Sequence, residues 1–169
     1  MFDNQLSGHL PEDLCHGGKL QIFSVHGNQL TGPIPKGLRN CSSLITGRFD
    51  RNQFIGDISN SFGIYPRLKY LDIRHKNFHG QLSQNWSKCK NLTALVMAYN
   101  NISGNIPPEV GNSTQLQRLD LSSNHLVGEI PKEFGKMKSM LNFSLANNHL
   151  SSIIPTELGY CELIEVLDL

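Results

Sequence analysis

A 24-residue period runs through the chain and constrains its fold more than any other feature. Asparagine recurs in one phase of this period, at residues 4, 28, 52, 100, 124 and 148, and Lys76 takes its place in the one remaining step. Glycine recurs four residues after each of these positions up to residue 128. Because one such turn cannot bury its own apolar residues, the period predicts a solenoid of stacked turns.

Six full turns, named below by their first residue, begin at Leu20, Leu44, Leu68, Leu92, Leu116 and Met140. A partial turn spans residues 1–19 and another spans 164–169. Aligned, the turns follow L-x-x-L-x-L-x-x-N-x-L-x-G-x-I-P-x-x-L, and only Gly47 interrupts the apolar columns. This pattern is typical of leucine-rich repeats. We therefore predict one array over residues 1–169, an α/β-type leucine-rich-repeat solenoid that forms a right-handed curved superhelix.

The spacing within a turn predicts its local structure. The L-x-L alternation predicts a short strand, so that stacked turns form a concave parallel β-sheet. The Ile-Pro step after each glycine disfavours helix, which predicts little regular helix on the convex side. A column of buried amides can satisfy backbone groups of neighbouring turns, because an amide offers both donors and acceptors. This structural column contains Asn28, Asn52, Asn100, Asn124 and Asn148.

The phrase Leu-x-Gly-x-Ile-Pro, at residues 30–35 and 126–131, resembles the plant-specific class of leucine-rich repeats. That class builds ectodomains of receptor-like kinases, receptor-like proteins and polygalacturonase inhibitors. Residues 49–54, 62–66 and 77–82 look like the receptor kinase subfamily that includes the receptor for SCOOP phytocytokine peptides. The resemblance implies a glycoprotein receptor at the extracellular face of the plasma membrane, with a role in plant defence. Its expected partners are a secreted peptide or a co-receptor ectodomain.

The chain contains no protein-kinase phrase and no catalytic motif, so we expect it not to be an enzyme. ATP and Mg would belong only to the kinase domain of the parent receptor, and no cofactor or metal site is expected in this chain. Its net charge of +1 argues against nucleic-acid binding. No apolar run is long enough to enter a membrane. Without a signal peptide, and with ends in mid-repeat, the chain is interpreted as a fragment or a truncated gene product.

Two alternatives to a receptor fragment stay open. The chain can be a short secreted inhibitor of a microbial cell-wall-degrading enzyme, because polygalacturonase inhibitors share this repeat class. It can also be a truncated, non-functional remnant, because solenoid ends normally need caps. A remnant of this kind is expected to fold poorly.

Six N-x-S/T sequons predict N-glycosylation, and they begin at Asn40, Asn85, Asn91, Asn101, Asn112 and Asn142. Most fall on the convex side of the predicted solenoid or at its edge, where a glycan fits. Asn142 differs, because it falls on a strand and a glycan there would obstruct the concave face. Asn-rich turns also generate sequons incidentally, so the sequons alone leave both interpretations open.

The four cysteines invite a disulfide interpretation, but their positions favour free thiols. Cys41, Cys89 and Cys161 share one column at distances of about 10 to 14 Å, beyond disulfide reach. Cys15 and Cys41 lie on adjacent turns but differ in phase, which makes this pair the less favoured alternative.

Outward-facing strand residues are the candidates for ligand binding, and the Leu44 and Leu68 turns depart most from the repeat. The candidate peptide- or partner-binding residues are Arg48, Asp50, Arg51, Tyr70, Asp72, Arg74, His75 and Tyr99. Arginine forks can bind a peptide carboxylate, and tyrosine can pack on its side chains. Alternatively, these charges neutralise one another, with Arg48 beside Asp72 and Asp50 between His26 and Arg74.

Overall fold

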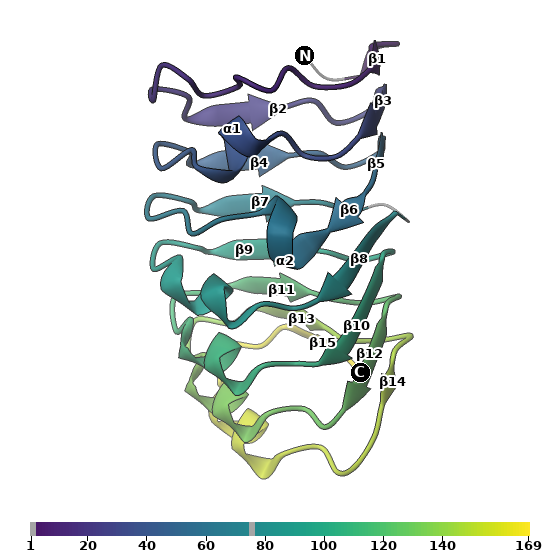
Figure 1. The fold of residues 1–169 in the computed structure, drawn as a ribbon. Helices are drawn as coiled ribbons and strands as arrows, with labels where there is room; N and C mark the ends of the chain where they lie inside the picture. The colour runs from purple at the N-terminus through teal and green to yellow at the C-terminus, as the bar shows by residue number, and fades with distance from the viewer. Residues whose placement is uncertain (1–2, 75–76) are drawn as a thin grey trace.

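A stack of parallel turns forms the protein in a computed structural model, which describes residues 3–74 and 77–169 (Figure 1). Within these residues one parallel sheet has seven strands, in the order β15-β13-β11-β9-β7-β4-β2. They are β2 (Ile22–Ser24), β4 (Thr46–Arg48), β7 (Tyr70–Asp72), β9 (Ala94–Val96), β11 (Arg118–Asp120), β13 (Asn142–Ser144) and β15 (Val166–Asp168). The register advances by 24 residues per strand, which confirms the predicted solenoid fold.

A second set of parallel strands lies beside the first and contains the glycine column. In the described residues it forms a three-stranded sheet of β1 (Ser7–Gly8), β3 (Gln29–Gly32) and β5 (Gln53–Phe54). A five-stranded sheet continues it with β6 (Gly56–Asp57), β8 (Phe78–Gln81), β10 (Asn101–Asn105), β12 (His125–Gly128) and β14 (His149–Leu150). The sequence predicted extended segments here but not their pairing, because glycine is depleted in strands.

The outer side carries short helical segments, as predicted. They are the α-helices α1 (Lys36–Arg39) and α2 (Ile58–Ser61) and the 3₁₀ helices η1 (Gln84–Lys88), η2 (Pro108–Asn112), η3 (Lys132–Lys136) and η4 (Thr156–Tyr160). None of the helices in the described residues has the length and hydropathy to span a membrane.

Two kinds of residue stand immediately before these helical segments. A proline with extended backbone precedes α1, η2, η3 and η4. In the two turns that lack this proline, a side chain caps the segment instead. The Asp57 carboxylate accepts a hydrogen bond from the Ser59 amide, and the Ser83 hydroxyl accepts one from the Asn85 amide. A polar cap thus replaces the conformational restriction of proline.

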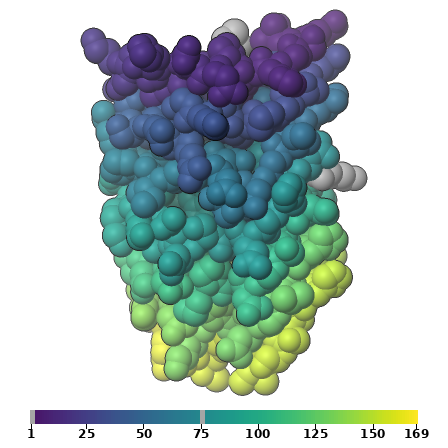
Figure 2. Space-filling view, in the orientation of Figure 1, coloured from purple at the N-terminus to yellow at the C-terminus, as the bar shows by residue number. Residues whose placement is uncertain are grey.

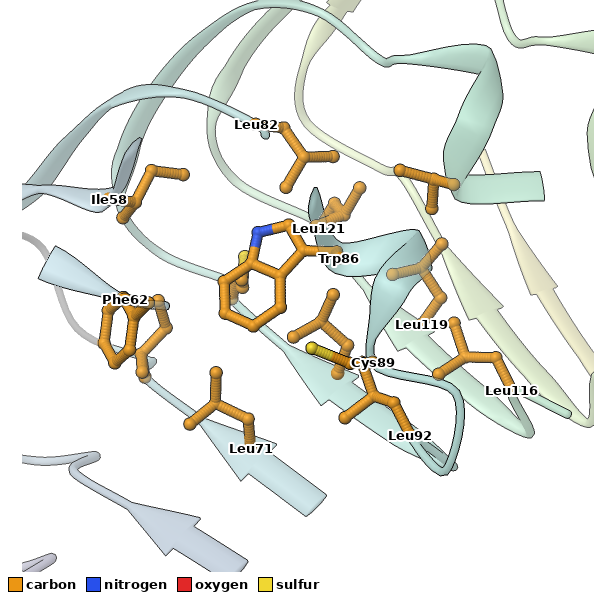
Figure 3. Close-up of a cluster of buried hydrophobic side chains, with 14 of the residues drawn as sticks. Ile58, Phe62, Leu71, Leu82, Trp86, Cys89, Leu92, Leu116, Leu119 and Leu121 are labelled. Carbon is orange, nitrogen blue, oxygen red and sulfur yellow. The ribbon is translucent and has the colours of Figure 1, made fainter. Parts of the chain in front are cut away.

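One continuous apolar core fills the space between the seven-stranded sheet and the outer helical segments. Figure 3 shows part of it, with Phe62, Trp86 and Leu71 converging from neighbouring turns. Gly47, which interrupts the apolar column, leaves no void. A Cβ atom at this position would lie 3.0 Å from Leu71 Cδ1 and 3.1 Å from Phe49 Cε2. The larger neighbours therefore occupy the space of the missing side chain.

Each asparagine of the structural column links two turns. The Asn52 side-chain oxygen accepts a hydrogen bond from the Leu30 amide at 3.0 Å, and its Nδ2 donates to the Val25 carbonyl at 2.9 Å. Asn124 makes the corresponding bonds to the Ile102 amide and the Met97 carbonyl. Lys76, the exception in this column, lies outside the described residues. The column satisfies buried backbone groups that would otherwise lack partners.

The prediction that all four cysteines are free thiols was wrong for two of them. Cys15 and Cys41 form a disulfide, with their Cα atoms 5.7 Å apart. Pro11 and Leu14 keep their repeat positions, but residues 12–17 form consecutive turns where the next repeat has a short helix, and Cys15 has a φ of 76°. This local path removes the phase difference between the two cysteines. Cys89 and Cys161 are buried free thiols, as predicted, and burial raises the pKa of both.

Candidate functional site

The concave sheet brings five of the candidate residues together at its N-terminal half. Arg48 ends β4, and Tyr70 and Asp72 lie in the neighbouring strand β7. Asp50 and Arg74 each follow one of these strands by two residues. The backbone register sets Arg48 opposite Asp72. We call Arg48, Asp50, Tyr70, Asp72 and Arg74 the charged cluster.

Asp72 is the centre of the charged cluster, and its side chain is fully buried. The Arg74 guanidinium donates to it through Nε at 3.0 Å and through Nη2 at 2.8 Å. The Tyr70 hydroxyl donates to the same carboxylate at 3.1 Å. These hydrogen bonds from Arg74 to Asp72 raise the pKa of Arg74, and burial with the nearby Asp72 charge raises the pKa of Tyr70.

Arg48 and Asp50 form a second and looser pair. Arg48 Nε lies 3.5 Å from Asp50 Oδ1, and the Asp50 side chain is only 3 % exposed. Among the described residues, neither of these two atoms has a hydrogen-bond partner of good geometry. The pair therefore relies on charge attraction, which is stronger in this partly desolvated position than in water.

In the described residues the Arg48–Asp50, Arg74–Asp72 and Arg118–Asp120 pairs each lie within one turn, unlike the neutralisation between neighbouring strands considered from sequence. The reason lies at the strand ends. The Arg74 amide donates to Asp72 Oδ1 at 3.2 Å, and the Ser122 amide donates to Asp120 Oδ1 at 3.3 Å. Each bond turns the carboxylate toward residues of its own chain segment. His26 differs, because it lies 3.9 Å from Asp3 of the preceding turn. The outward alternation was readable from the sequence, whereas this choice of partner was not.

Arg51 and Tyr99 form the exposed rim of this region. Tyr99 is 56 % exposed, and Arg51 is also exposed. Both have left-handed backbone, with a φ of 55° at Arg51 and 57° at Tyr99, in the position before the structural asparagine. Left-handed backbone is uncommon for such side chains. The two residues lie two turns apart, and the predicted site residue between them, His75, falls outside the described residues.

The six sequon asparagines differ in their accessibility. Asn40, Asn85, Asn91 and Asn112 are exposed on or beside the outer helical segments, and Asn101 is exposed at the start of β10. Asn142 is half-buried in β13 on the concave sheet. Five positions thus have space for a glycan, and glycosylation of any of them stays a prediction.

Comparison with known proteins places the repeats in a family. Leucine-rich-repeat family models match residues 19–41, 66–126 and 139–161, which together exceed half of the chain. No curated protein sequence matches the chain significantly.

Solved structures give close matches over almost the whole chain. A structure of PEPR1 with AtPEP1 has a TM-score of 0.94 at 31 % identity, covering 98 % of this chain and 23 % of that one. The plant peptide hormone receptor RGFR1 in complex with RGF2 has a TM-score of 0.94 at 30 % identity, covering 99 % and 27 %. The Arabidopsis receptor kinase HAESA, with the peptide hormone IDA and the co-receptor SERK1, has a TM-score of 0.79 at 33 % identity, covering 98 % and 32 %.

The chain spans about a quarter to a third of the length of these solved receptors. A leucine-rich-repeat protein of Leptospira interrogans matches at 23 % identity, and this likeness shows the fold alone. The matched regions of the receptors are repeat arrays without catalytic function. The chain belongs to the leucine-rich-repeat family, and over its length it is similar to segments of plant receptor-kinase ectodomains.

Proposed function

We propose that the chain is an extracellular recognition module of a plant receptor kinase that binds a secreted peptide along its concave sheet. The observation that carries the proposal is the similarity, over 98 % of the chain and at about 30 % identity, to receptors solved with bound peptides. A co-receptor ectodomain is the second partner of the proposal, because the HAESA complex contains one.

The dimensions of the concave sheet suit an extended peptide. Six steps between neighbouring strands, at about 4.8 Å each, give a face roughly 30 Å long, and about nine extended residues span this length. The charged cluster lies beneath such a path, with Arg51 and Tyr99 beside it. Arg51 can pair with a peptide carboxylate, and Tyr99 can cover an apolar side chain.

Within the charged cluster, Asp72 has a positioning role. It holds the Arg74 guanidinium and the Tyr70 hydroxyl in one arrangement, so that neither has to be ordered when a ligand binds. Arg74 is 37 % exposed in its side chain and still presents part of its guanidinium to the concave face.

The Cys15–Cys41 disulfide and the exposed sequons support an extracellular location. Disulfides persist in oxidising compartments, and N-glycans are added to secreted chains. Membrane attachment, signalling through a Ser/Thr kinase and a role in defence belong to the parent receptor of this proposal. ATP and Mg would be bound only by that kinase domain.

Two exposed rim residues provide the sharpest test, because neither contributes to the buried ion pairs. The variant R51A/Y99A is compared with R67A/Y160A, which removes the same residue types at exposed positions outside the concave sheet. Each purified protein is titrated with a synthetic panel of plant secreted peptides in a calorimeter. We expect a peptide that binds the native chain to bind R51A/Y99A about tenfold or more weakly.

The control variant is expected to bind like the native chain. Circular dichroism melting establishes that both variants are folded. Unchanged affinity of R51A/Y99A, or an equal loss in both variants, would overturn the placement of the site.

A further inference from the structure

A groove crosses three successive turns on the outer side, away from the seven-stranded sheet. It has a volume of about 620 Å³ and runs between the second set of strands and the 3₁₀ helices η2, η3 and η4. Its apolar lining includes Ile153, which is largely exposed, and the edges of Ile106 and Ile130, which belong to the core and are 2 % and 8 % exposed. This outer side faces the viewer in Figures 1 and 2, with the three turns in green to yellow at the lower end.

The rim of the groove is acidic. Glu129, Glu133 and Glu157 line it, and Lys132 is the one basic lining residue. Glu157 accepts a hydrogen bond from Thr156, but none of the three carboxylates forms an ion pair within residues 3–74 and 77–169. We call these three glutamates and the three isoleucines the acidic groove.

The acidic character follows the repeat only in part, because Glu133 and Glu157 share a column with Glu109 of the Leu92 turn. At the position of Glu129, the four preceding full turns carry Pro33, Asp57, Gln81 and Asn105. At the position of Glu133, the Leu20, Leu44 and Leu68 turns carry Gly37, Ser61 and Asn85. The acidic groove is therefore a feature of the last three full turns.

Ile153 gives the acidic groove an apolar surface that water contacts. Its side chain is 78 % exposed, and the equivalent residues in the two preceding turns are Asn105 and Glu129. Burying an isoleucine of this exposure releases a substantial hydrophobic free energy. An aliphatic side chain placed beside Ile153 would also cover the edge of Ile130.

The sequons leave this part of the surface open. In the Leu92, Leu116 and Met140 turns they begin at Asn101, Asn112 and Asn142, and none of these residues lines the acidic groove. Glycans on the exposed sequons would therefore attach beside the groove and not inside it.

We propose that the acidic groove docks an extended segment of a partner protein in which lysine or arginine residues alternate with aliphatic ones. The aliphatic side chains contact Ile153 and the edge of Ile130, and the basic groups pair with the glutamates at the rim. Long basic side chains suit this surface, because their methylene stems cover apolar atoms while the charge stays at the edge. The site is independent of the concave sheet, so the partner and a bound peptide can occupy the chain together.

Defined peptides test the proposal on the full 169-residue chain. The probe is an acetylated and amidated peptide of alternating leucine and lysine, and the matched peptide has glutamate in place of lysine. Two-dimensional amide NMR maps where each binds. We expect the lysine peptide to shift resonances of residues 105–108, 129–133 and 153–157, and the glutamate peptide to leave them unchanged.

Two matched pairs of variants sharpen the test. The variant E129Q/E133Q/E157Q is compared with E12Q/E162Q/E165Q, which removes equal charge outside the acidic groove. I153S is compared with I22S, which changes an exposed isoleucine outside the acidic groove, on the concave sheet. We expect each groove variant to weaken the lysine peptide about tenfold, and the controls to bind like the native chain. Binding should also weaken in higher salt, because the charged rim is exposed.

Four results would overturn the proposal. The first is equal binding of the two peptides, and the second is an equal loss in the groove variants and their controls. The third is an NMR map in which the lysine peptide shifts only the concave strands. Self-association of the free chain through the groove, measured by analytical ultracentrifugation, would likewise overturn it. Because the concave site is tested by R51A/Y99A, failure of one proposal is distinguishable from failure of the other.

Discussion

The Leu44 and Leu68 turns depart from the repeat pattern, whereas the Leu92 and Leu116 turns follow it, yet all four stack in one continuous register. Their cores differ in composition. Phe49 in the irregular half packs against Phe23, Phe54 and Phe62, with ring centroids 5.5 to 6.1 Å apart. In the regular half, Leu121 occupies the position equivalent to Phe49 and is fully buried.

The two halves also differ in how charge is placed on the concave sheet. The Arg74–Asp72 pair of the irregular half has a contact of 2.8 Å and a carboxylate with 0 % exposure. The Arg118–Asp120 pair of the regular half has a contact of 3.6 Å, with side-chain exposures of 44 % and 16 %. The comparison teaches that the hydrogen bonds between neighbouring strands and the asparagine column maintain the register. In the irregular turns, aromatic packing and buried charge pairs take the place of the residues that the repeat pattern would supply.

Among the substitutions that test this comparison, Phe49→Ala is expected to cause the largest loss of stability. It removes the ring that fills the space beside Gly47, and a cavity remains because the neighbouring turns are held by their ladders. We expect the free energy of unfolding to fall by about 4 kcal/mol, measured by urea denaturation. Leu121→Ala at the equivalent position should cost about 3 kcal/mol. A smaller loss for Phe49→Ala than for Leu121→Ala would contradict the role given to the aromatic cluster.

The disulfide links the first, partial turn to the Leu20 turn, next to the irregular half, and the described regular half has no such link. The variant C15S/C41S opens a loop of 26 residues and should lose about 3 kcal/mol. Hydrogen exchange should place the loss in residues 11–48 and leave strands β11 and β13 protected. Reductant added to the native chain should reproduce the effect and should not change C15S/C41S further. Uniform deprotection of the whole array would show that the disulfide stabilises more than its own turns.

The two ion pairs allow a direct test of burial. Arg74→Ala leaves the buried Asp72 carboxylate without its main partner, and we expect a loss of about 2 kcal/mol. Arg118→Ala removes the exposed counterpart and should cost less than about 0.5 kcal/mol. Thermal melts of both variants measure the difference, and D72N/R74A should recover part of the first loss. Equal effects of the two arginine variants would refute the distinction between the halves.

The smallest expected effect concerns the cap of α2, which replaces the proline of regular turns. Asp57→Ala should cost about 1 kcal/mol at neutral pH. The side-chain hydrogen bond from Ser59 lowers the pKa of Asp57 below its usual value. The ionised Asp57 cap therefore contributes fully to the free energy of unfolding above the pKa that Asp57 has in the unfolded chain. This contribution is lost as the pH falls through the lower pKa that Asp57 has in the folded chain. Asp57→Asn keeps a capping oxygen and should remove this acid dependence from the melting curves. If Asp57→Asn melts with the same dependence on acid pH as the native chain, other carboxylates are responsible for that dependence.

The 24-residue repeat by itself determined the solenoid, the inward columns, the parallel strands, the short outer helical segments and the outward position of Arg48, Tyr70 and Asp72. These features follow from local periodicity, which repeats the same side-chain direction in every turn. Tertiary structure alone decided three others: the Cys15–Cys41 pair, the partners of the concave charges and the acidic groove. Each depends on the path of an irregular segment, on a backbone amide at a strand end or on side chains from three turns meeting in space. The repeat specifies where a residue lies around a turn, but the neighbours it meets depend on how the turns deviate from one another.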